Sequence, residues 1–456
     1  MVERLGKLFP DNLLERESGE KEYRLSAIAP ALEAAGQDPG GPVWRWFAEK
    51  PDWTEHLAAM ERAAALGRGR LTPPVVRALY GERFNMSASR LEKLRQCHFA
   101  YFMQYGLKAK QRETASFDAP QIGTFLHFIL ENVTAEASKQ GGFANVSQEM
   151  LRRLTDRFMD AYIQKELPNL QDRTARFRYL FSRLRTTAYA VVEETAQELA
   201  QSDFVPVEFE LSFGDKGTLP AVTVSEPDGE LRVNGKVDRV DGWIKDNRLY
   251  LRVVDYKTGK KSFDLAEVRM GLDIQMLLYL FALQNEGKAY FGREVVPAGV
   301  LYLPARDDIL AQERNVTPEK LAQERAKALR RSGLVLSEPE VLRAMEHAAL
   351  TEPKYLPLRV DREGNLSGGI ATAAQLGKLG NYVEHLLHTI ADEVRSGVID
   401  ADPCCHDESD SVCQFCDWAP ACHFEDGRGG DRLRYIQKVT AAEFWQQMDG
   451  EEDERG

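Results

Sequence analysis

The spacing of apolar and polar residues changes character in the middle of the chain, near residue 205. Apolar residues recur at helical intervals over about 121–201, with one interruption at the glycine pair 141–142. Beyond that interval, four short segments rich in β-branched and aromatic residues predict strands at 205–213, 231–244, 249–256 and 298–303. The polar run KDNR at 245–248 fits a hairpin turn, and 273–286 has the composition of a helix before the last strand.

The segments on either side of this strand-rich part are predicted to be helical. A helix capped by Ser87 or Ser89 opens the segment 87–107. From residue 316 onward we expect mostly helix, up to a cysteine-rich segment at 404–422 and an acidic tail. A mixed sheet flanked by helices, of the α/β or α+β class, follows from this order of elements.

Composition narrows the class of protein. The chain has 456 residues, 43% of them hydrophobic, and a formal net charge of −12, which fits two or three globular domains and excludes a surface coated in phosphate-binding charge. It has no apolar run of about 18 residues and no apolar signal segment, so we expect a cytoplasmic protein without a membrane span. No P-loop sequence occurs. Residues 152–185 carry nine basic and four acidic side chains, which fits a phosphate-binding groove or a solvated helix face equally well.

One predicted strand has the apolar start of a buried strand but also carries two charged residues. In VVDYKTGK (253–260), alternation places Asp255 and Lys257 on one face of the strand. An ion pair at a sheet edge would explain them without any chemistry. The predicted hairpin, however, also brings Asp238 beside them, and converging carboxylates repel each other unless a cation lies between them. Such oxygen ligands suit Mg²⁺ or Mn²⁺, with the lysine beside an attacking water and Gly259 allowing a phosphodiester to approach closely.

Two pairs of residues one helical turn apart add to this pattern. They are His127 with Glu131, and Gln275 with Tyr279 in the helix that follows the D-x-K strand. Taken alone, a histidine on an apolar helix is more often a core residue, and the second pair fits ordinary amphipathicity. It is their order along the chain that connects them to the carboxylates.

The ordered set G-x-x-x-H, G-x-V-D-R-V-D, D-Y-K-T-G and Q-x-x-x-Y resembles the RecB-type branch of the PD-(D/E)xK nucleases. The resemblance implies a restriction-endonuclease-like mixed central sheet flanked by helices. Glu210 matches an acid found upstream in some members. The implied catalytic residues are Asp238, Asp255, Lys257, Gln275 and Tyr279, and the implied ligands of Mg²⁺ or Mn²⁺ are His127, Asp238 and Asp255.

The cysteines form a second constellation. Cys413, Cys416 and Cys422 have C-x₂-C-x₅-C spacing, and Cys97 is the only cysteine outside 404–422. Four thiolates suit Zn²⁺ or an iron–sulfur cluster, and the spacing alone does not choose between them.

The family resemblance does choose. RecB-type nucleases with a [4Fe–4S] cluster place one cysteine before the nuclease core and three after it. A structural cluster on Cys97, Cys413, Cys416 and Cys422, tying the N- and C-terminal ends of the domain together, is therefore implied. The side chains that could compete as ligands are Cys404, Cys405, His98, His406 and His423.

The flanks of the motifs extend the resemblance. Residues 87–107, 301–308 and 330–346 are similar to the C-terminal part of AddB subunits of bacterial AddAB helicase–nucleases, and the similarity covers about 70–440. It implies an exonuclease that acts on single-stranded DNA ends, on the 5′-ended strand, during double-strand break repair and recombination. The implied partner is an AddA-type helicase–nuclease subunit.

This interpretation divides the chain into three parts. Residues 1–80 would be a helical remnant of the helicase-like region, 81–436 the nuclease domain with its cluster, and 437–456 an acidic tail. An AddB subunit has a long helicase-like region with a P-loop, and no P-loop sequence occurs here. Three interpretations of the chain therefore stay open: a fragment, a truncated product and a short relative. Two other functions also stay open: a stand-alone RecB-type nuclease, and a catalytically inactive iron–sulfur scaffold that binds DNA.

Overall fold

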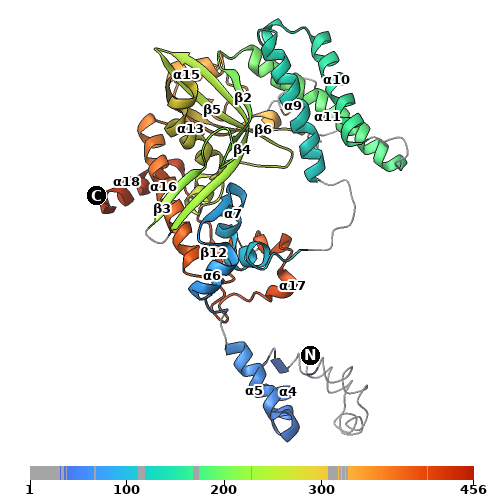
Figure 1. Cartoon of the computed structure of the whole chain (residues 1–456), viewed down its shortest axis with the longest axis vertical. Helices are drawn as coiled ribbons and strands as arrows, with labels where there is room; N and C mark the ends of the chain where they lie inside the picture. Colours follow the sequence, from blue (N-terminus) through green and yellow to red (C-terminus); the bar gives the residue numbers. More distant parts are fainter. Residues whose placement is uncertain are drawn as a thin grey trace.

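The computed structural model describes residues 31, 35–36, 38–65, 68–110, 119–167, 174–226, 229–306, 317, 320, 324, 327–407 and 409–455. Its main body is an eight-stranded mixed sheet with helices packed around it (Figure 1). The predicted fold class, a mixed central sheet flanked by helices, is confirmed. Among the described helices, none is long and apolar enough to cross a membrane.

Strand β4 (Gly229–Lys245) organises the sheet, because four other strands pair with it. Its first half pairs with β1 (Phe84–Ser87) and β3 (Val222–Glu226), and its second half with β2 (Val205–Phe213) and β5 (Arg248–Lys257). From β5 the sheet continues through β6 (Glu294–Pro304) and β7 (Ser332–Leu336) to β10 (Ile370–Ala371). β5 and β6 are parallel and need a crossover, which α12 (Leu265–Arg269) and α13 (Gln275–Phe291) supply.

The four predicted strands are confirmed as β2, β4, β5 and β6, and the predicted hairpin joins β4 to β5. The expectation of mostly helix after 316 is wrong. β7 and β10 join the main sheet there, and β8 (Leu358–Val360) and β9 (Leu366–Gly368) form a separate hairpin. These strands have two to five residues, too few for periodicity to separate strand from helix.

Long helices flank the sheet. The helical interval 121–201 becomes α9 (Ala119–Lys139), α10 (Gln148–Glu166) and α11 (Ala175–Ala200), which lie together beside the sheet in Figure 1. The segment 276–283 of α13 is apolar and buried on all sides, because the helix packs on β5 and β6 and also contacts α16 (Ala373–Arg395) and α7 (Ala88–Gln96). At the start of α7, Ser87 is the cap, since its hydroxyl accepts a hydrogen bond from the backbone N–H of Arg90.

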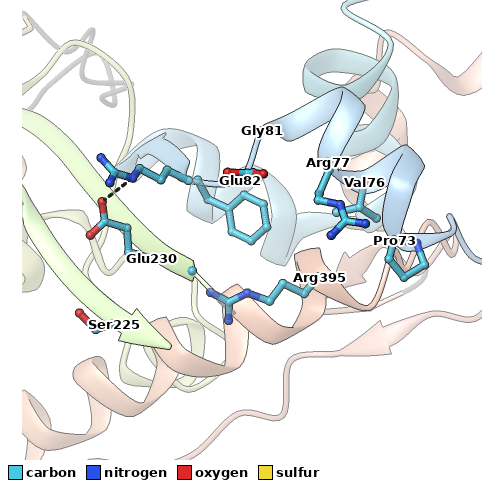
Figure 2. Close-up of a pocket in the computed structure, with 11 residues that line it drawn as sticks. Pro73, Val76, Arg77, Gly81, Glu82, Ser225, Glu230 and Arg395 are labelled. Carbon is cyan, nitrogen blue, oxygen red and sulfur yellow. Dashed lines mark ion pairs between the residues drawn. The ribbon is translucent and has the colours of Figure 1, made fainter. Parts of the chain in front are cut away.

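Both ends of the described chain pack as helices. α4 (Pro42–Ala48) and α5 (Pro51–Ala65) form a small core of their own around Trp44 and Phe47. α6 (Pro73–Tyr80) instead adds Val76 to the main core, and Figure 2 shows its Arg77 facing Arg395 of α16. The last helix, α18 (Ala441–Arg455), contributes to the main core through Phe444, Trp445 and Met448. The remaining short elements are α8 (His98–Tyr101), η1 (Phe102–Gly106), η2 (Phe143–Asn145), α15 (Pro339–Met345), β11 (Cys404–Cys405), η4 (Val412–Phe415), α17 (Ala419–Cys422) and β12 (Arg434–Tyr435).

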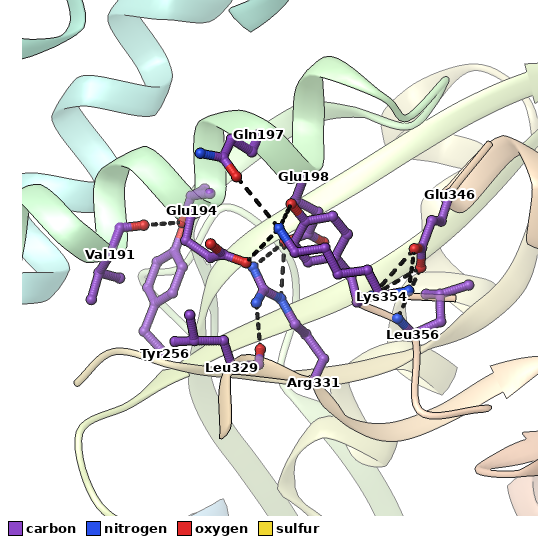
Figure 3. A network of polar contacts seen from close by, with 12 residues as sticks. Val191, Glu194, Gln197, Glu198, Tyr256, Leu329, Arg331, Glu346, Lys354 and Leu356 are labelled. Carbon is purple, nitrogen blue, oxygen red and sulfur yellow. Dashed lines mark hydrogen bonds and ion pairs between the residues drawn. The ribbon is translucent and has the colours of Figure 1, made fainter. Parts of the chain in front are cut away.

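A buried charge network fixes one face of the sheet against α11. Asp241 accepts hydrogen bonds from Arg239 at 2.7 and 3.0 Å and from Arg252 at 2.9 Å. Glu198 of α11 accepts from Arg331 at 2.6 and 3.0 Å and pairs with Arg252 at 3.4 Å (Figure 3). Burial alone would raise the pKa of Glu198, but the arginine charges outweigh it and lower the pKa to about 2.

Replacing Glu198 by glutamine is expected to lower the free energy of unfolding by about 3–5 kcal/mol, because buried Arg331 loses its counter-charge and buried Arg252 loses one of two. Urea unfolding at pH 7, followed by circular dichroism, measures the change. The control is Glu149→Gln, whose exposed carboxylate lies 3.7 Å from Arg153 and should contribute less than about 1 kcal/mol. Since folding lowers the pKa of Glu198 from 4.5, its contribution is present above that pH and is lost as the pH falls towards 2. Equal stabilities of the two variants at pH 7 would contradict this account.

Candidate active site and cysteine cavity

Three carboxylates stand in a row across adjacent strands. Phe209 pairs with Arg239 and Leu211 with Val237, so Glu210 of β2 lies opposite Asp238 of β4. Arg239 pairs with Val254, so the next position places Asp238 opposite Asp255 of β5. Paired strands are about 4.8 Å apart, which brings the three acids close together on one face of the sheet. We call Glu210, Asp238 and Asp255 the acid row.

Alternation along β4 and β5 separates the acid row from the charge network. Tyr256, between Asp255 and Lys257, points its hydroxyl to Arg239 on the opposite face at 3.1 Å. The backbone N–H of the same tyrosine donates to Oδ2 of Asp238 at 2.8 Å. The predicted separation of Asp255 and Lys257 from Tyr256 is therefore confirmed, and Asp238 is anchored to the neighbouring strand.

His127 approaches the acid row from α9. Its Nε2 lies 2.9 Å from the backbone oxygen of Tyr256, and its Nδ1 lies 3.5 Å from Oδ2 of Asp238. A carbonyl oxygen can only accept, so Nε2 carries the proton in the neutral ring and the Nδ1 lone pair is available to a metal. Burial alone would lower the pKa of His127, but Asp238 outweighs it and raises the pKa.

The donor set fits a divalent cation. Among the described residues, only His127, Glu210 and Asp238 form a group of three or more potential ligands whose atoms all lie within 4.8 Å of one another. Asp255 lies next to this group. Its buried Oδ2 forms an ion pair with the Lys257 ammonium at 2.7 Å. Burial and then the charge of Asp238 raise the pKa of Asp255 to about 6, a cost that a bound cation would offset.

Lysines border the acid row on both sides. Lys236 pairs with Glu210, and Lys257 lies over the ring of Tyr302 at 5.5 Å from its centroid. Tyr302 is the β6 residue opposite Asp255, so the lysine is held at the end of the row where a substrate phosphate could approach. Gly259 has no atom within 4 Å of where a Cβ would be, which leaves room beside Lys257.

Gln275 and Tyr279 lie on α13 beside the same strands. The side-chain amide of Gln275 donates to the Tyr279 hydroxyl at 3.5 Å. That hydroxyl occupies the space where a Cβ on Gly235 would lie, at 1.9 Å, so glycine is required in the NGKVD segment. Burial raises the pKa of Tyr279, and the charge of Asp255 adds to the effect. Both predicted residues are thus close to the acid row without belonging to it.

Two further acids were not predicted as site residues. Glu92 of α7 lies 3.4 Å from the backbone nitrogen of Gln275, and burial followed by the charge of Asp273 raises its pKa. Glu131 lies one turn after His127, and burial followed by the charge of Glu210 raises its pKa. Glu131 was visible in the sequence only as a helical neighbour of the histidine, and Glu92 gave no signal.

The basic stretch 152–185 is divided between α10 and α11, with Arg173 outside the described residues. Several of its arginines pair with carboxylates, including Arg157 with Glu136 and Arg185 with Asp156. This pairing favours a solvated helix face over a continuous phosphate-binding groove.

The four cysteines assigned to a cluster line one cavity of about 430 Å³. Cys97, from the turn between α7 and α8, faces Cys413, Cys416 and Cys422 across it. No three of these sulfurs lie within 4.8 Å of one another. Four thiolates on Zn²⁺ would be about 3.8 Å apart, given Zn–S bonds of about 2.3 Å, so the cavity fits a larger group better than a single ion.

The competing side chains have other roles. Cys404 donates to the backbone oxygen of Arg95 at 3.2 Å, and neither it nor Cys405 lines the cavity. His98 bonds Asp402 at 2.8 Å, and His406 pairs with Glu267 at 3.3 Å. Of the five alternatives, only His423 reaches the cavity wall.

The family model of the PD-(D/E)XK nuclease superfamily matches residues 85–423, a range that contains the acid row, Lys257 and all four cavity cysteines. The chain belongs to this superfamily.

Relatives carry a more specific name, that of a subunit of an ATP-dependent helicase/deoxyribonuclease. The protein so named is 32% identical to the whole chain in Acetivibrio thermocellus, 29% over 98% of it in Clostridium perfringens, and 28% over the whole chain in Clostridium acetobutylicum. The resemblance to AddB-type subunits is confirmed. The chain spans 41–42% of the length of these relatives.

Loss of either central ligand should weaken metal binding. We expect Asp238→Asn and Glu210→Gln each to reduce Mn²⁺ affinity at least about tenfold, measured by isothermal titration calorimetry. Glu208→Gln is the matched control, because Glu208 lies on the same strand but bonds Tyr290. If Glu210→Gln bound Mn²⁺ as the wild type does, the metal site would not include this acid.

The cysteine cavity should hold iron. Protein purified without oxygen is expected to be brown and to contain about four iron and four sulfide per chain. Cys97→Ser and Cys416→Ser should lose both, whereas Cys404→Ser should keep them, because Cys404 faces Arg95 and not the cavity. Stoichiometric zinc without iron would contradict the cluster assignment.

Proposed function

We propose that this chain is a metal-dependent deoxyribonuclease that hydrolyses single-stranded DNA from its ends. The observation that carries the proposal is the acid row: three carboxylates and His127 converge where Lys257 and a metal could act on one phosphate. Membership of a nuclease superfamily and the deoxyribonuclease names of the relatives support it.

The proposed mechanism assigns a task to each group. His127, Glu210, Asp238 and Asp255 hold Mg²⁺ or Mn²⁺, which when bound supplies charge to polarise the phosphate and acidify a water. Lys257 donates to the attacking water and offsets the charge that develops on the phosphate. Asp255 keeps the lysine in place, and Gln275 and Tyr279 fix the shape of the pocket beside it.

The names of the relatives support part of the proposed setting. They are named as one subunit of an ATP-dependent helicase/deoxyribonuclease, which supports an AddA-type helicase–nuclease partner. We further propose action on the 5′-ended strand during double-strand break repair and recombination in the cytoplasm, and a structural [4Fe–4S] cluster on the four cavity cysteines.

Asp255→Ala and Lys257→Ala should each lower the rate of Mg²⁺-dependent cleavage at least about 100-fold without unfolding the protein. The assay uses single- and double-stranded oligonucleotides, labelled at the 5′ or 3′ end, with and without Mg²⁺ and ATP. The control is Lys245→Ala, because Lys245 lies at the hairpin end of β4 and pairs with Glu340.

The outcomes separate the candidate functions. Wild-type cleavage rates in both active-site variants would refute the assignment. A wild-type protein that binds DNA but never cleaves it would be an inactive scaffold. Cleavage that is unaffected by an added helicase partner would indicate a stand-alone nuclease.

A further inference from the structure

A cavity of about 770 Å³ opens beside the cysteine cavity, against the edge strand β1. Its wall is aromatic and cationic: Tyr80, Tyr105 and Trp418 alternate with Arg90, Lys108 and Lys110. These six residues come from α6, α7, the segment from η1 onward and the cysteine loop, so four parts of the chain converge there. None of them has a task in the proposed catalysis.

The aromatic rings are arranged as a partly open surface. The guanidinium of Arg90 lies over the ring of Tyr105, 4.7 Å from its centroid, and covers part of one face of that ring. Tyr101, buried beneath, packs against both Tyr80 and Tyr105 with centroid distances of 5.7 and 5.2 Å. Tyr80, Tyr105 and Trp418 are only half-buried, so their outer faces can accept another planar group.

The charge of the cavity is opposite to that of the chain. Among the described residues, three cations line it against one carboxylate, Asp417, in a protein whose net charge is −12. Arg90, Lys108 and Lys110 are all exposed. Cations that track a backbone beside rings that accept any base are the features by which proteins hold single-stranded nucleic acid.

The other large cavity at the edge of β1 is less suitable. It is lined by Arg77, Arg83 and Arg395, but Arg83 pairs with Glu230 at 3.4 Å and Glu82 adds a further negative charge (Figure 2). Its only aromatic residue, Phe84, is buried. It offers no face on which a base could stack.

The sheet register relates the aromatic cavity to the acid row. Asn85 of β1, which lines the cavity, pairs with Arg232 of β4, and Asp238 lies six residues further along that strand, so alternation places it on the same face. At about 3.3 Å per residue the separation along β4 is about 20 Å. At about 3.4 Å per stacked nucleotide, that is no more than about six nucleotides.

We propose that this cavity is a stacking site for unpaired bases, which holds single-stranded DNA within about six nucleotides of the scissile phosphate. The direction of the strand in this inference rests on the proposed nuclease function. The site itself does not, because DNA binding alone tests it. The cysteine loop, through Trp418, thereby forms part of the DNA-binding surface in addition to its cluster ligands.

Binding tests the site directly. Trp418→Ala and Tyr105→Ala, in an Asp255→Ala background without added divalent metal, should each bind a fluorescent oligothymidylate about tenfold more weakly by anisotropy. Trp418→Phe and Tyr105→Phe should restore affinity, because both keep a ring. Tyr290→Ala is the control, since this partly exposed tyrosine lies at the far end of α13. Iron content is measured for each variant. If Trp418→Ala has lost its cluster, the affinity of Tyr105→Ala is the deciding measurement.

An abasic oligonucleotide of equal length isolates the contribution of the bases. It should bind the wild type more weakly than oligothymidylate does, and this difference should shrink in iron-replete Tyr105→Ala, in which Tyr80 and Trp418 remain. Unchanged oligothymidylate affinity in both alanine variants would overturn the proposal. It would also be overturned if the variants kept DNA affinity and lost only their helicase partner, because the surface would then be a protein interface.

A small substrate separates this inference from the proposed function. Hydrolysis of bis(p-nitrophenyl) phosphate needs only the acid row, so Tyr105→Ala should keep the wild-type rate while its KM for a long oligonucleotide rises about tenfold. An equal loss on both substrates would mean that the tyrosine acts on the catalytic centre and would refute the stacking site. If the wild type cleaves neither substrate, the proposed function is refuted. The binding experiments alone then test the stacking site.

Discussion

Repulsion between Glu210, Asp238 and Asp255 is the constraint on which the rest of the structure depends. Strand pairing holds the three carboxylates side by side, although negatively charged groups at this spacing repel each other. Burial first, and then the charge of Asp238, raises the pKa of Asp255 to about 6. His127, Lys236 and Lys257 each form an ion pair with an acid of the row and so offset part of the repulsion. A divalent cation is the one species that would satisfy all three acids together.

The buried charge network lies on the opposite face of the same strands. Asp238 is followed at once by Arg239, and Asp241 lies two residues further, so β4 carries charge on both of its faces. A slip of one residue would bring Arg239 into the acid row and leave Asp241 without Arg252, exchanging the two faces. Burying five charged groups is costly in itself, yet removing one partner costs more. We infer that the network fixes the register of β4 and β5, and thereby the geometry of the acids.

The sequence was sufficient for the parts of the site that depend on local geometry. A period of two and a hairpin are enough to place Asp238, Asp255 and Lys257 together. Glu210 is different, because the acids in VEFELSF alternate with apolar residues and only the β2–β4 register shows that Glu210, not Glu208, faces Asp238. Its positive φ of 51°, rare for a residue other than glycine, is also invisible in the sequence. Glu92 joins the site through the packing of α7 on α13, a long-range contact that no local pattern encodes. The same limit applies to β7, whose five residues reveal their strand only by pairing with β6.

The segment from β1 to η1 connects the sheet that carries the acid row to the cysteine cavity. β1 pairs with β4, α7 follows directly, and Cys97 ends α7 before α8 and η1 begin. Arg95 holds this segment to the backbone of Met270 at 2.9 Å, and His98 holds it to Asp402 at 2.8 Å. On the opposite wall of the cysteine cavity, Arg68 bonds the backbone oxygen of Cys422 at 2.7 Å and so restrains the cysteine loop. A group bound by all four thiolates would join these two walls. It would restrain the distance between Tyr105 and Trp418, because Trp418 lies two residues after Cys416 and Tyr105 follows Cys97 on the continuous segment formed by α8 and η1. The structural role of the cysteines and the shape of the aromatic cavity are therefore one constraint, imposed beside β1, which pairs with the strand that carries Asp238.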